Sequence, residues 1–405
     1  MKILLTHRYF WPDTAPYAVM LRTIGDALAD ARCEVHIFSS IASYRATDIQ
    51  SPQQQQLGPL NVRRTWVFSG EKSSPVKRLA NAVIYCVALF FEVLRLRPAV
   101  VTASTFPPVV AAWSASLASR ITGAQFIYHM QDIHPEVAQI CGDRLGRGHP
   151  MHLLRWLDNQ TLRRSSAIIV LSQDMAETLQ ARGLKDLPIH IINNFSLDLV
   201  GSVRSAPPAE LRKPAGRRRI IFAGNLGRFQ NLSLLTEGVA LVLARHPDLE
   251  LLFLGDGTMT SKLKHQWGSH PQITFGKFLP FEQARELIRE SDIGLVSLSP
   301  GLFRAAFPSK VLTYLGLGVP ILALVEPDSQ LARSLTQSRL GTVPAENTPE
   351  AIAISLERLL ANKIGSRAIL DWYAAHAGVE HVIGSWKQII KELSFRQRRK
   401  AGMGT

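Results

Sequence analysis

The segment PSKVLTYLGLGVPILALVEPDS, residues Pro308–Ser329, is the stretch that decides the predicted fold. Pro308 disfavours helix before it, and Ser309 can cap the helix that follows, so we expect the backbone amides of residues 309–311 to point out of the helix end. The helix is expected to stop at Gly318, and ILALV is typical of a continuous apolar strand. The segment therefore predicts a loop, helix, strand unit of an α/β sheet, with a place for an anion at the helix start.

Alternating apolar strands and amphipathic helices extend from this segment in both directions. This alternation predicts an α/β fold with two Rossmann-like parallel-sheet domains that face a cleft, where ligands bind at the carboxyl ends of the strands. Strands are expected at 3–5, 35–38, 62–67, 100–103, 126–128, 168–171, 220–223, 251–254, 273–275, 293–296 and 321–325. Helices are expected at 17–31, 76–96, 107–120, 151–163, 232–245, 259–267, 282–290, 309–316, 349–361 and 381–400.

A break in this pattern separates the two halves of the chain. Residues 196–219 are rich in Ser, Pro, Gly and Arg and have no sustained period, which is typical of a linker. We therefore expect an N-terminal domain at residues 1–195, a second domain at residues 220–378, and a C-terminal helix with a basic tail at residues 379–405. The QQQQ run at residues 53–56 is interpreted as a polar loop.

Composition and charge narrow the classes of partner. The 405 residues carry a net charge of +14, which favours anionic partners such as phosphorylated molecules, nucleic acid or an anionic membrane surface. Three widely spaced cysteines favour neither a disulfide framework nor a zinc site and fit a reducing cytoplasm. No run approaches the roughly 20 consecutive apolar residues of a membrane-spanning helix. The loop after the first strand lacks glycine, which argues against a dinucleotide cofactor, and no Asp-x-Asp pair is present to hold a metal.

A glycine-containing loop opens the second half of the chain. In FAGNLGRFQNLSLL, residues 222–235, Gly224 and Gly227 lie between a strand and a helix, with Arg228 beside them. This arrangement allows a phosphate to approach the backbone, although a plain strand-to-helix turn has the same pattern. Lys310, at the start of another helix of the same domain, favours the phosphate interpretation. The LLFLGDG stretch at residues 251–257 indicates by itself only a turn.

Polar residues follow a buried strand of the first half. The stretch YHMQDIHPE places Gln131, Asp132, His134 and Glu136 at the carboxyl end of that strand, where they could bind hydroxyls or transfer a proton. The alternative is that Asp132 caps a turn. The histidines of this region show no metal-ligand spacing and are interpreted as core or surface residues: His129, His134, His149 and His152.

The helix expected near residues 76–97 has a polar stripe opposite an apolar face. Basic residues flank it at both ends, so it could lie on an anionic membrane, or it could be a core helix of the sheet. The flanking residues are Lys77, Arg78, Arg95 and Arg97.

The joint order of these motifs resembles a known family. MKILLTHRYFWP, YHMQDIHPE, FAGNLGRFQNL, LLFLGDG and PSKVLTYLGLGVPILA, in this order, are similar to the family-4 retaining glycosyltransferases of the GT-B type. The likeness is closest to the bacterial branch that builds capsule, O-antigen and colanic-acid-like polysaccharides. It implies an acceptor-binding domain at residues 1–195 and a nucleotide-sugar-binding domain at residues 220–378.

The resemblance also implies an activity. The enzyme would transfer a hexosyl or deoxyhexosyl group, with retained configuration and without a metal or cofactor, from a nucleotide-diphosphate sugar to a lipid-linked saccharide. Asp132 would be the catalytic residue that orients the acceptor or a sugar hydroxyl, with Gln131, His134 and Glu136 nearby. The protein would be cytoplasmic and peripheral on the anionic inner face of the plasma membrane, with no nucleic-acid partner.

Donor residues follow by position, with departures from the family. The two family glutamates fall on Ala305 and Thr313, the family Arg and Lys of the phosphate loop fall on Asn225 and Gln230, and the family His falls on Gln131. These departures leave two rivals, a nucleotide-sugar epimerase of the same fold and a non-catalytic sugar-nucleotide or lipid-binding partner. The implied donor residues are Gly224, Asn225, Arg228, Gln230, Ser309, Lys310 and Thr313.

Overall fold

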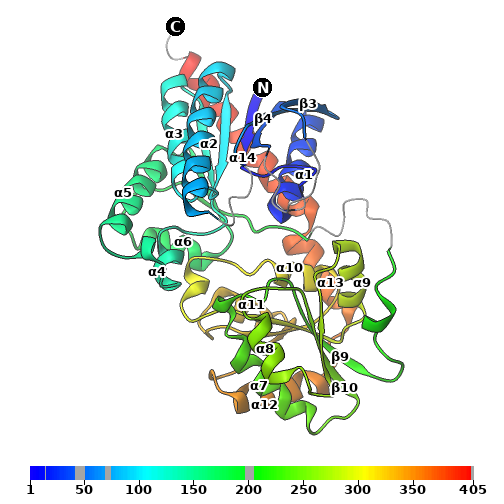
Figure 1. Cartoon of the computed structure of the whole chain (residues 1–405). Coiled ribbons are helices and arrows are strands. Elements are labelled where there is room, and N and C mark those ends of the chain that lie inside the picture. Colours follow the sequence, from blue (N-terminus) through cyan, green and yellow to red (C-terminus); the bar gives the residue numbers. More distant parts are fainter. Residues whose placement is uncertain (14, 42–50, 69–73, 197–204, 403–405) are drawn as a thin grey trace. The chain divides into compact units, whose positions relative to one another are not determined.

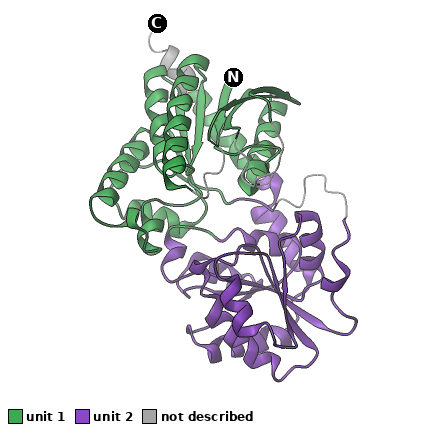
Figure 2. Ribbon diagram, in the orientation of Figure 1, with its two compact units in different colours: residues 1–193, 305–307, 382–405 green, residues 194–304, 308–381 purple. Residues whose placement is uncertain are grey.

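The computed structural model describes the whole chain except residues 14, 42–50, 69–73, 197–204 and 403–405 (Figure 1). The chain forms two compact units, each with its own sheet and core (Figure 2). Unit 1 contains residues 1–193, 305–307 and 382–405, and unit 2 contains residues 194–304 and 308–381. The expected α/β class with two Rossmann-like parallel-sheet domains is confirmed.

Unit 1 is built on an eight-stranded sheet in the order β3-β4-β2-β1-β5-β6-β7-β8. Every neighbouring pair is parallel except β3 with β4. The strands are β1 Lys2–Thr6, β2 Glu34–Ser40, β3 Gln54–Leu57, β4 Leu60–Thr65, β5 Val100–Ser104, β6 Gln125–His129, β7 Ala167–Val170 and β8 Ile189–Ile191. The helices are α1 Pro16–Asp30, α2 Pro75–Leu96, α3 Val110–Thr122, α4 Glu136–Ile140, α5 Gly148–Arg164, α6 Gln173–Gln180 and, from residue 382 on, α14 Val379–Gly402.

Unit 2 is built on a six-stranded parallel sheet in the order β11-β10-β9-β12-β13-β14. Its core joins apolar strand residues to the inward faces of α7 and α12. The strands are β9 Arg218–Ala223, β10 Leu249–Leu254, β11 Ile273–Gly276, β12 Ile293–Ser297, β13 Ile321–Leu324 and β14 Gly341–Thr342. The helices are α7 Leu232–Leu243, α8 Thr260–Trp267, α9 Phe281–Arg289, α10 Lys310–Gly316, α11 Gln330–Gln337, α12 Pro349–Ala361 and α13 Ser366–Ala377.

The strand order fixes where ligands are expected in each unit. In unit 1 the order reverses between β1 and β5, and in unit 2 it reverses between β9 and β12. At such a switch point the two loops leave in opposite directions and open a crevice at the carboxyl edge of the sheet. The loops that contain Asp132 and Lys310 both follow strands at or beside these points.

The interpretation of residues 53–56 as a loop was wrong. Gln54–Leu57 form β3, which pairs antiparallel with β4 through a turn at Gly58, whose φ is +57°. Gln54 and Gln56 are exposed, because alternate side chains of a strand lie on the same face and that face of an antiparallel pair can be open to water. A polar composition therefore did not prevent strand formation.

Helix α2 places its polar stripe against the protein and its apolar stripe outward. Asn81, Tyr85 and Glu92 are buried. The Asn81 side chain exchanges hydrogen bonds with the backbone of Phe68, at 2.7 and 2.8 Å, and Glu92 forms an ion pair of 2.9 Å with Arg63.

Its outward stripe consists of apolar side chains between 51% and 76% exposed, namely Val76, Leu79, Val83, Val87 and Phe91. By length and composition alone, α2 is also the one helix among the described residues that could cross a membrane, with a mean hydropathy of 1.8 over its most apolar window.

Candidate functional site

The loop after β9 has a backbone shape that requires glycine. Gly224 has φ +116°, in the region that L side chains rarely adopt. The chain then passes through Leu226 and Gly227 into a short 3₁₀ turn at Arg228–Gln230 before α7 begins. Gln230 holds this turn together, because its Oε1 accepts a hydrogen bond of 3.3 Å from the Gly227 amide. Asn225 and Arg228 are exposed on the same loop.

The backbone of the GDG turn after β10, residues 255–257, packs directly against the backbone of this loop. A Cβ atom at Gly255 would lie 2.0 Å from the Gly224 carbonyl oxygen, and one at Gly257 would lie 2.4 Å from the Leu226 carbonyl oxygen. The Leu226 amide also donates a hydrogen bond of 3.0 Å to the Asp256 carbonyl. Both glycines are therefore needed for backbone-to-backbone packing, a role that the sequence did not reveal.

Lys310 lies against the same loop with its ammonium group inaccessible to solvent. Its Nζ is 3.4 Å from the centroid of the Phe222 ring and 4.0 Å from the position of a Cβ at Gly224. No residue that the structure describes hydrogen-bonds to this nitrogen. Burial lowers the pKa of Lys310 from 10.5 to about 7. An anion at this loop would supply the missing partner.

Tyr314, which the sequence analysis did not select, joins α10 to β9. Its hydroxyl accepts a hydrogen bond of 2.8 Å from the Ala223 amide, and its ring covers Gly294, where a Cβ would lie 2.6 Å from the ring. The side chain is fully buried. Tyr314 therefore fixes the helix that carries Lys310 to the strand that carries the glycine loop.

The expected geometry at the start of α10 was wrong in two details. The Ser309 side chain forms no capping hydrogen bond, because Ser309 itself has helical backbone angles, φ −56° and ψ −25°. The Val311 amide is not free, since it donates a hydrogen bond of 3.0 Å to the Pro308 carbonyl. Thr313 lies within α10 and is half-buried.

In unit 1, Asp132 lies on the loop that follows β6. Its backbone pairs with Ala306 in an isolated antiparallel bridge, and the next amide, of Ile133, donates a hydrogen bond of 2.7 Å to the Ala305 carbonyl. Ala305 is fully buried in the unit 1 core. Burial raises the pKa of the Asp132 carboxyl from 3.8 to about 6.

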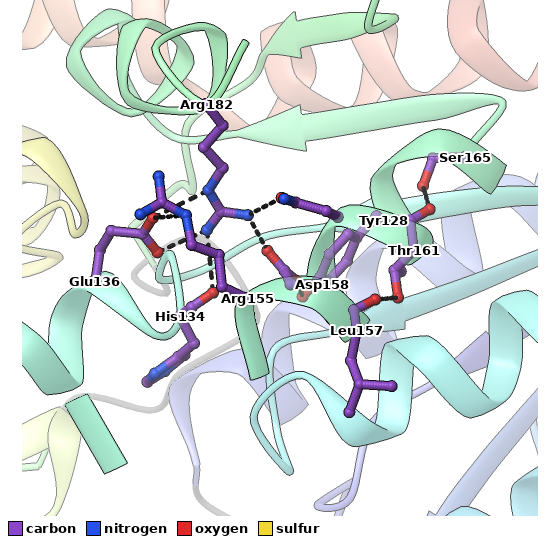
Figure 3. Close-up of polar contacts among 10 residues, drawn as sticks. Tyr128, His134, Glu136, Arg155, Leu157, Asp158, Thr161, Ser165 and Arg182 are labelled. Carbon is purple, nitrogen blue, oxygen red and sulfur yellow. Dashed lines mark hydrogen bonds and ion pairs between the residues drawn. The ribbon is translucent and has the colours of Figure 1, made fainter. Parts of the chain in front are cut away.

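The next part of this loop is held by a buried arginine (Figure 3). Arg182 forms ion pairs of 2.6 Å with Glu136 and 2.5 Å with Asp158, and donates a hydrogen bond of 3.1 Å to the His134 carbonyl. The Tyr128 hydroxyl donates to the other oxygen of Asp158 at 2.9 Å. The Glu136 carboxylate is thus paired with Arg182. Burial lowers the pKa of the nearby His134 imidazole to about 4.

A second polar cluster gathers at the carboxyl ends of β1, β5 and β6. His7 Nδ1 is 2.5 Å from Ser104 Oγ, the Tyr17 hydroxyl is 2.8 Å from His129 Nδ1, and His129 Nε2 is 3.0 Å from the Gln131 amide nitrogen. Burial lowers the pKa of both His7 and His129 to about 3, so both imidazoles are neutral at pH 7. The one available signal was that His7, Ser104 and His129 closely follow predicted strands, whereas Tyr17 lies at the start of a predicted helix.

The basic residues around α2 are arranged differently at its two ends. Lys77 and Arg78 are exposed in the first turn, and Arg97 is exposed just beyond the last. Arg95 is engaged by Glu92 in an ion pair of 2.6 Å. Within the described part of the chain, no group of three or more His, Cys, Asp or Glu side chains is placed to hold a metal ion.

Comparison with known families connects these two sites to an activity. Residues 17–194 match the glycosyl transferase 4-like domain, and residues 217–362 match the domain of glycosyl transferases group 1. The chain is built from two glycosyltransferase domains. The first match contains the Asp132 loop, and the second contains the Gly224 loop and Lys310.

Individual relatives agree with this assignment. The chain is 24% identical over 283 residues to the "Probable glycosyltransferase WbjE" of Pseudomonas aeruginosa, covering 67% of this chain and 70% of the relative. Among solved structures, the sucrose-phosphate synthase of Thermosynechococcus elongatus has a TM-score of 0.75 at 15% identity, covering 98% of this chain and 99% of the other. Anabaena Alr3699/HepE in complex with UDP has a TM-score of 0.64 at 16% identity, covering 97% and 100%. The two structures support the GT-B fold of the glycosyltransferase.

Proposed function

We propose that the protein transfers a sugar from a nucleotide-diphosphate sugar, whose diphosphate binds between the Gly224 loop and Lys310 of unit 2. The observation that carries this proposal is the ammonium group of Lys310, which is enclosed by protein and has no hydrogen-bond partner among the described residues. A buried cation without a hydrogen-bond partner is costly, and a diphosphate is the anion that a glycine loop and a lysine commonly bind together. The UDP complex of the structural neighbour HepE supports the same class of donor.

Charge on the leaving group then determines the chemistry of unit 2. As the glycosidic bond to the donor breaks, negative charge develops on the diphosphate. Lys310 in a desolvated position, together with the exposed guanidinium of Arg228, would stabilise that charge without a metal ion. Pre-organised cations of this kind lower the barrier because they need no reorganisation during the reaction.

For unit 1 we propose binding of the acceptor. Asp132, whose carboxyl has a pKa raised by burial to about 6, would orient an acceptor or sugar hydroxyl, with Gln131 and the neutral imidazole of His134 beside it. We also propose that the transferred sugar keeps its anomeric configuration. The proposed acceptor is a lipid-linked saccharide from which a bacterial surface polysaccharide is built. Both proposals rest on the order of motifs in the sequence.

A peripheral position on the inner face of the plasma membrane is proposed from α2. Its apolar stripe from Val76 to Phe91 faces outward, while Asn81, Tyr85 and Glu92 on the opposite face are buried. Exposed apolar side chains flanked by basic ones suit an anionic lipid surface.

Calorimetric titration with UDP tests the donor site. Lys310→Met should weaken UDP binding by about 1.5–3 kcal/mol, the range of a hydrogen bond to a charged group. Because the pKa of free Lys310 is about 7 and an adjacent diphosphate raises it, wild-type binding at pH 8 should take up a proton. The binding enthalpy should then depend on the ionisation enthalpy of the buffer, and this dependence should vanish in the variant.

Exposed Lys262 on α8 provides the matched control, and Lys262→Met should bind UDP like the wild type. Equal affinity of Lys310→Met and wild type would remove Lys310 from the site. A panel of labelled nucleotide sugars, with membranes as acceptor source, separates transfer from the rivals. Conversion of the free donor without an acceptor would identify an epimerase, and no turnover of any donor would identify a binding partner.

A further inference from the structure

Unit 1 has a basic cavity at the edge of its sheet opposite to the Asp132 loop. The cavity, of about 250 Å³, lies where α3 and α5 end and β6 begins, and its lining includes Ser119, Arg120, Arg163 and Arg164. None of the side chains lining it is a carboxylate. Three arginines therefore share a small space without a balancing acid in its wall.

Two polar groups in this cavity have no hydrogen-bond partner in the described part of the chain. One is Nη1 of Arg164, which is inaccessible to solvent, and the other is Oγ of Ser119, whose residue is only 1% exposed. Buried donors are nearly always paired, and each unpaired one costs free energy. Burial and the nearby charge of Arg120 both lower the pKa of Arg164.

Helix geometry alone does not explain these groups. Basic residues in the last turn of a helix interact favourably with its dipole, which accounts for arginines at the ends of α3 and α5. It does not account for Ser119. Hydroxyls in helices usually donate to a preceding carbonyl, as Ser116 and Thr122 of α3 do at 2.9 and 3.1 Å, whereas Ser119 does not.

We propose that this cavity is a second anion site, which binds a phosphate group through Arg164, Arg120 and the Ser119 hydroxyl. Guanidinium groups bind phosphate oxygens in pairs, and a hydroxyl can donate to a third oxygen. Arg163 also lines a second cavity of about 590 Å³, whose wall includes Lys185, Arg396 and one carboxylate, Asp186, and which gives room for the rest of a phosphate ester. The ester is either a free molecule or the headgroup of a lipid.

The first arm of the test uses inorganic phosphate with full-length Lys310→Met, in which the donor site is disabled. Phosphate should still bind by calorimetry, and Arg164→Gln in this background should weaken binding by about tenfold, as expected for a lost charged hydrogen bond. Ser119→Ala should weaken it by a smaller factor. Without phosphate, Ser119→Ala should melt no lower than its parent, because it removes an unpaired buried hydroxyl. Arg144→Gln, at an exposed arginine of unit 1, is the matched control.

The second arm uses vesicles of phosphatidylcholine that contain either phosphatidic acid or phosphatidylglycerol. Arg164-dependent preference for the phosphomonoester of phosphatidic acid would assign the site to a lipid headgroup, and binding of free phosphate alone would assign it to a soluble ester. Equal binding by the parent, Arg164→Gln and Ser119→Ala in both arms would overturn the proposal. The Ser119→Ala variant keeps the test decisive even where Arg164→Gln does not fold.

Discussion

At the scale of single residues, burial shifts the titration of the Asp132 carboxyl toward neutral pH. Burial raises its pKa to about 6, above the value of 3.8 that it has when exposed. The folded protein therefore binds more protons than the unfolded chain between these two pH values, and the stability contributed by Asp132 falls as pH rises through this window. An ionised Asp132 is thus a local cost to the stability of the fold.

Asp132→Asn should raise the Tm at pH 7.5 and abolish most sugar transfer. Asparagine keeps the shape but avoids burying a charge. In the wild type, kcat/KM should decline as pH falls through about 6, because the ionised form of the free enzyme is lost, and the residual activity of the variant should lack this decline. Tm by calorimetry and a pH profile of transfer are the measurements.

Asp30→Asn, at an exposed aspartate of unit 1, should change neither quantity. A lower Tm for Asp132→Asn, together with normal transfer, would mean that Asp132 serves the fold and not the reaction.

The sequence points to candidate site residues that belong to local motifs. Gly224 and Lys310 could be selected because a loop between a strand and a helix, and a helix start, have short-range patterns, and the structure places the two residues side by side. The pairs His7 with Ser104 and Tyr17 with His129 join residues 97 and 112 positions apart, and no local pattern encodes such contacts.

At the scale of elements, the outward stripe of α2 is the feature most open to a direct test. Val83→Asp with Val87→Asp should leave the fold intact, because both side chains are more than half exposed. It should also reduce sedimentation with phosphatidylglycerol vesicles by about tenfold or more, since the apolar contact is lost and negative charge is added.

Ile354→Asp on α12 of unit 2, at a side chain 51% exposed, is the matched control and should not affect vesicle binding. Arg78→Glu is the better charge reversal, because Arg95 forms an ion pair with Glu92 and its reversal would disturb the protein itself. Undiminished sedimentation of both variants would leave α2 as a helix of the sheet only.

Many of the longer elements were predicted from their hydrophobic period, but helices α4, α6, α11 and α13 and strands β3, β8 and β14 were missed. The expected helix at 349–361 coincides with α12, and the expected strands of unit 2 all lie within or one residue beyond the observed ones. The strand β3 was missed because its glutamines carry no apolar signal. The orientation of α2 could not be predicted from the sequence either, since two hydrogen bonds between the Asn81 side chain and the Phe68 backbone, and an ion pair between Glu92 and Arg63, hold its polar side against the protein.

At the scale of the whole molecule, unit 1 depends on a helix from the end of the chain. Residues 382–405 belong to unit 1, where the Trp386 ring is 5.1 Å from that of His129. Removing residues 382–405 should therefore expose the unit 1 core and leave unit 2 folded. Limited proteolysis should then yield a resistant fragment of residues 194–381, and calorimetry should show that it still binds UDP.

Truncation after Gln397 is the control, because it removes only residues 398–405. In this variant unit 1 should resist proteolysis as it does in the full chain. Loss of UDP binding in the 382–405 deletion, or survival of an intact unit 1, would contradict this division of the molecule.

The place of α14 also has a consequence for synthesis. A ribosome releases the strands of unit 1 early, yet the helix that completes this unit emerges last, after all of unit 2. Unit 2 is contiguous but for residues 305–307, so it can fold while translation continues, contrary to the usual N-terminal-first order. The sheet of unit 1 therefore keeps apolar surface exposed until α14 has been synthesised. We expect chaperones to bind the nascent chain at this surface.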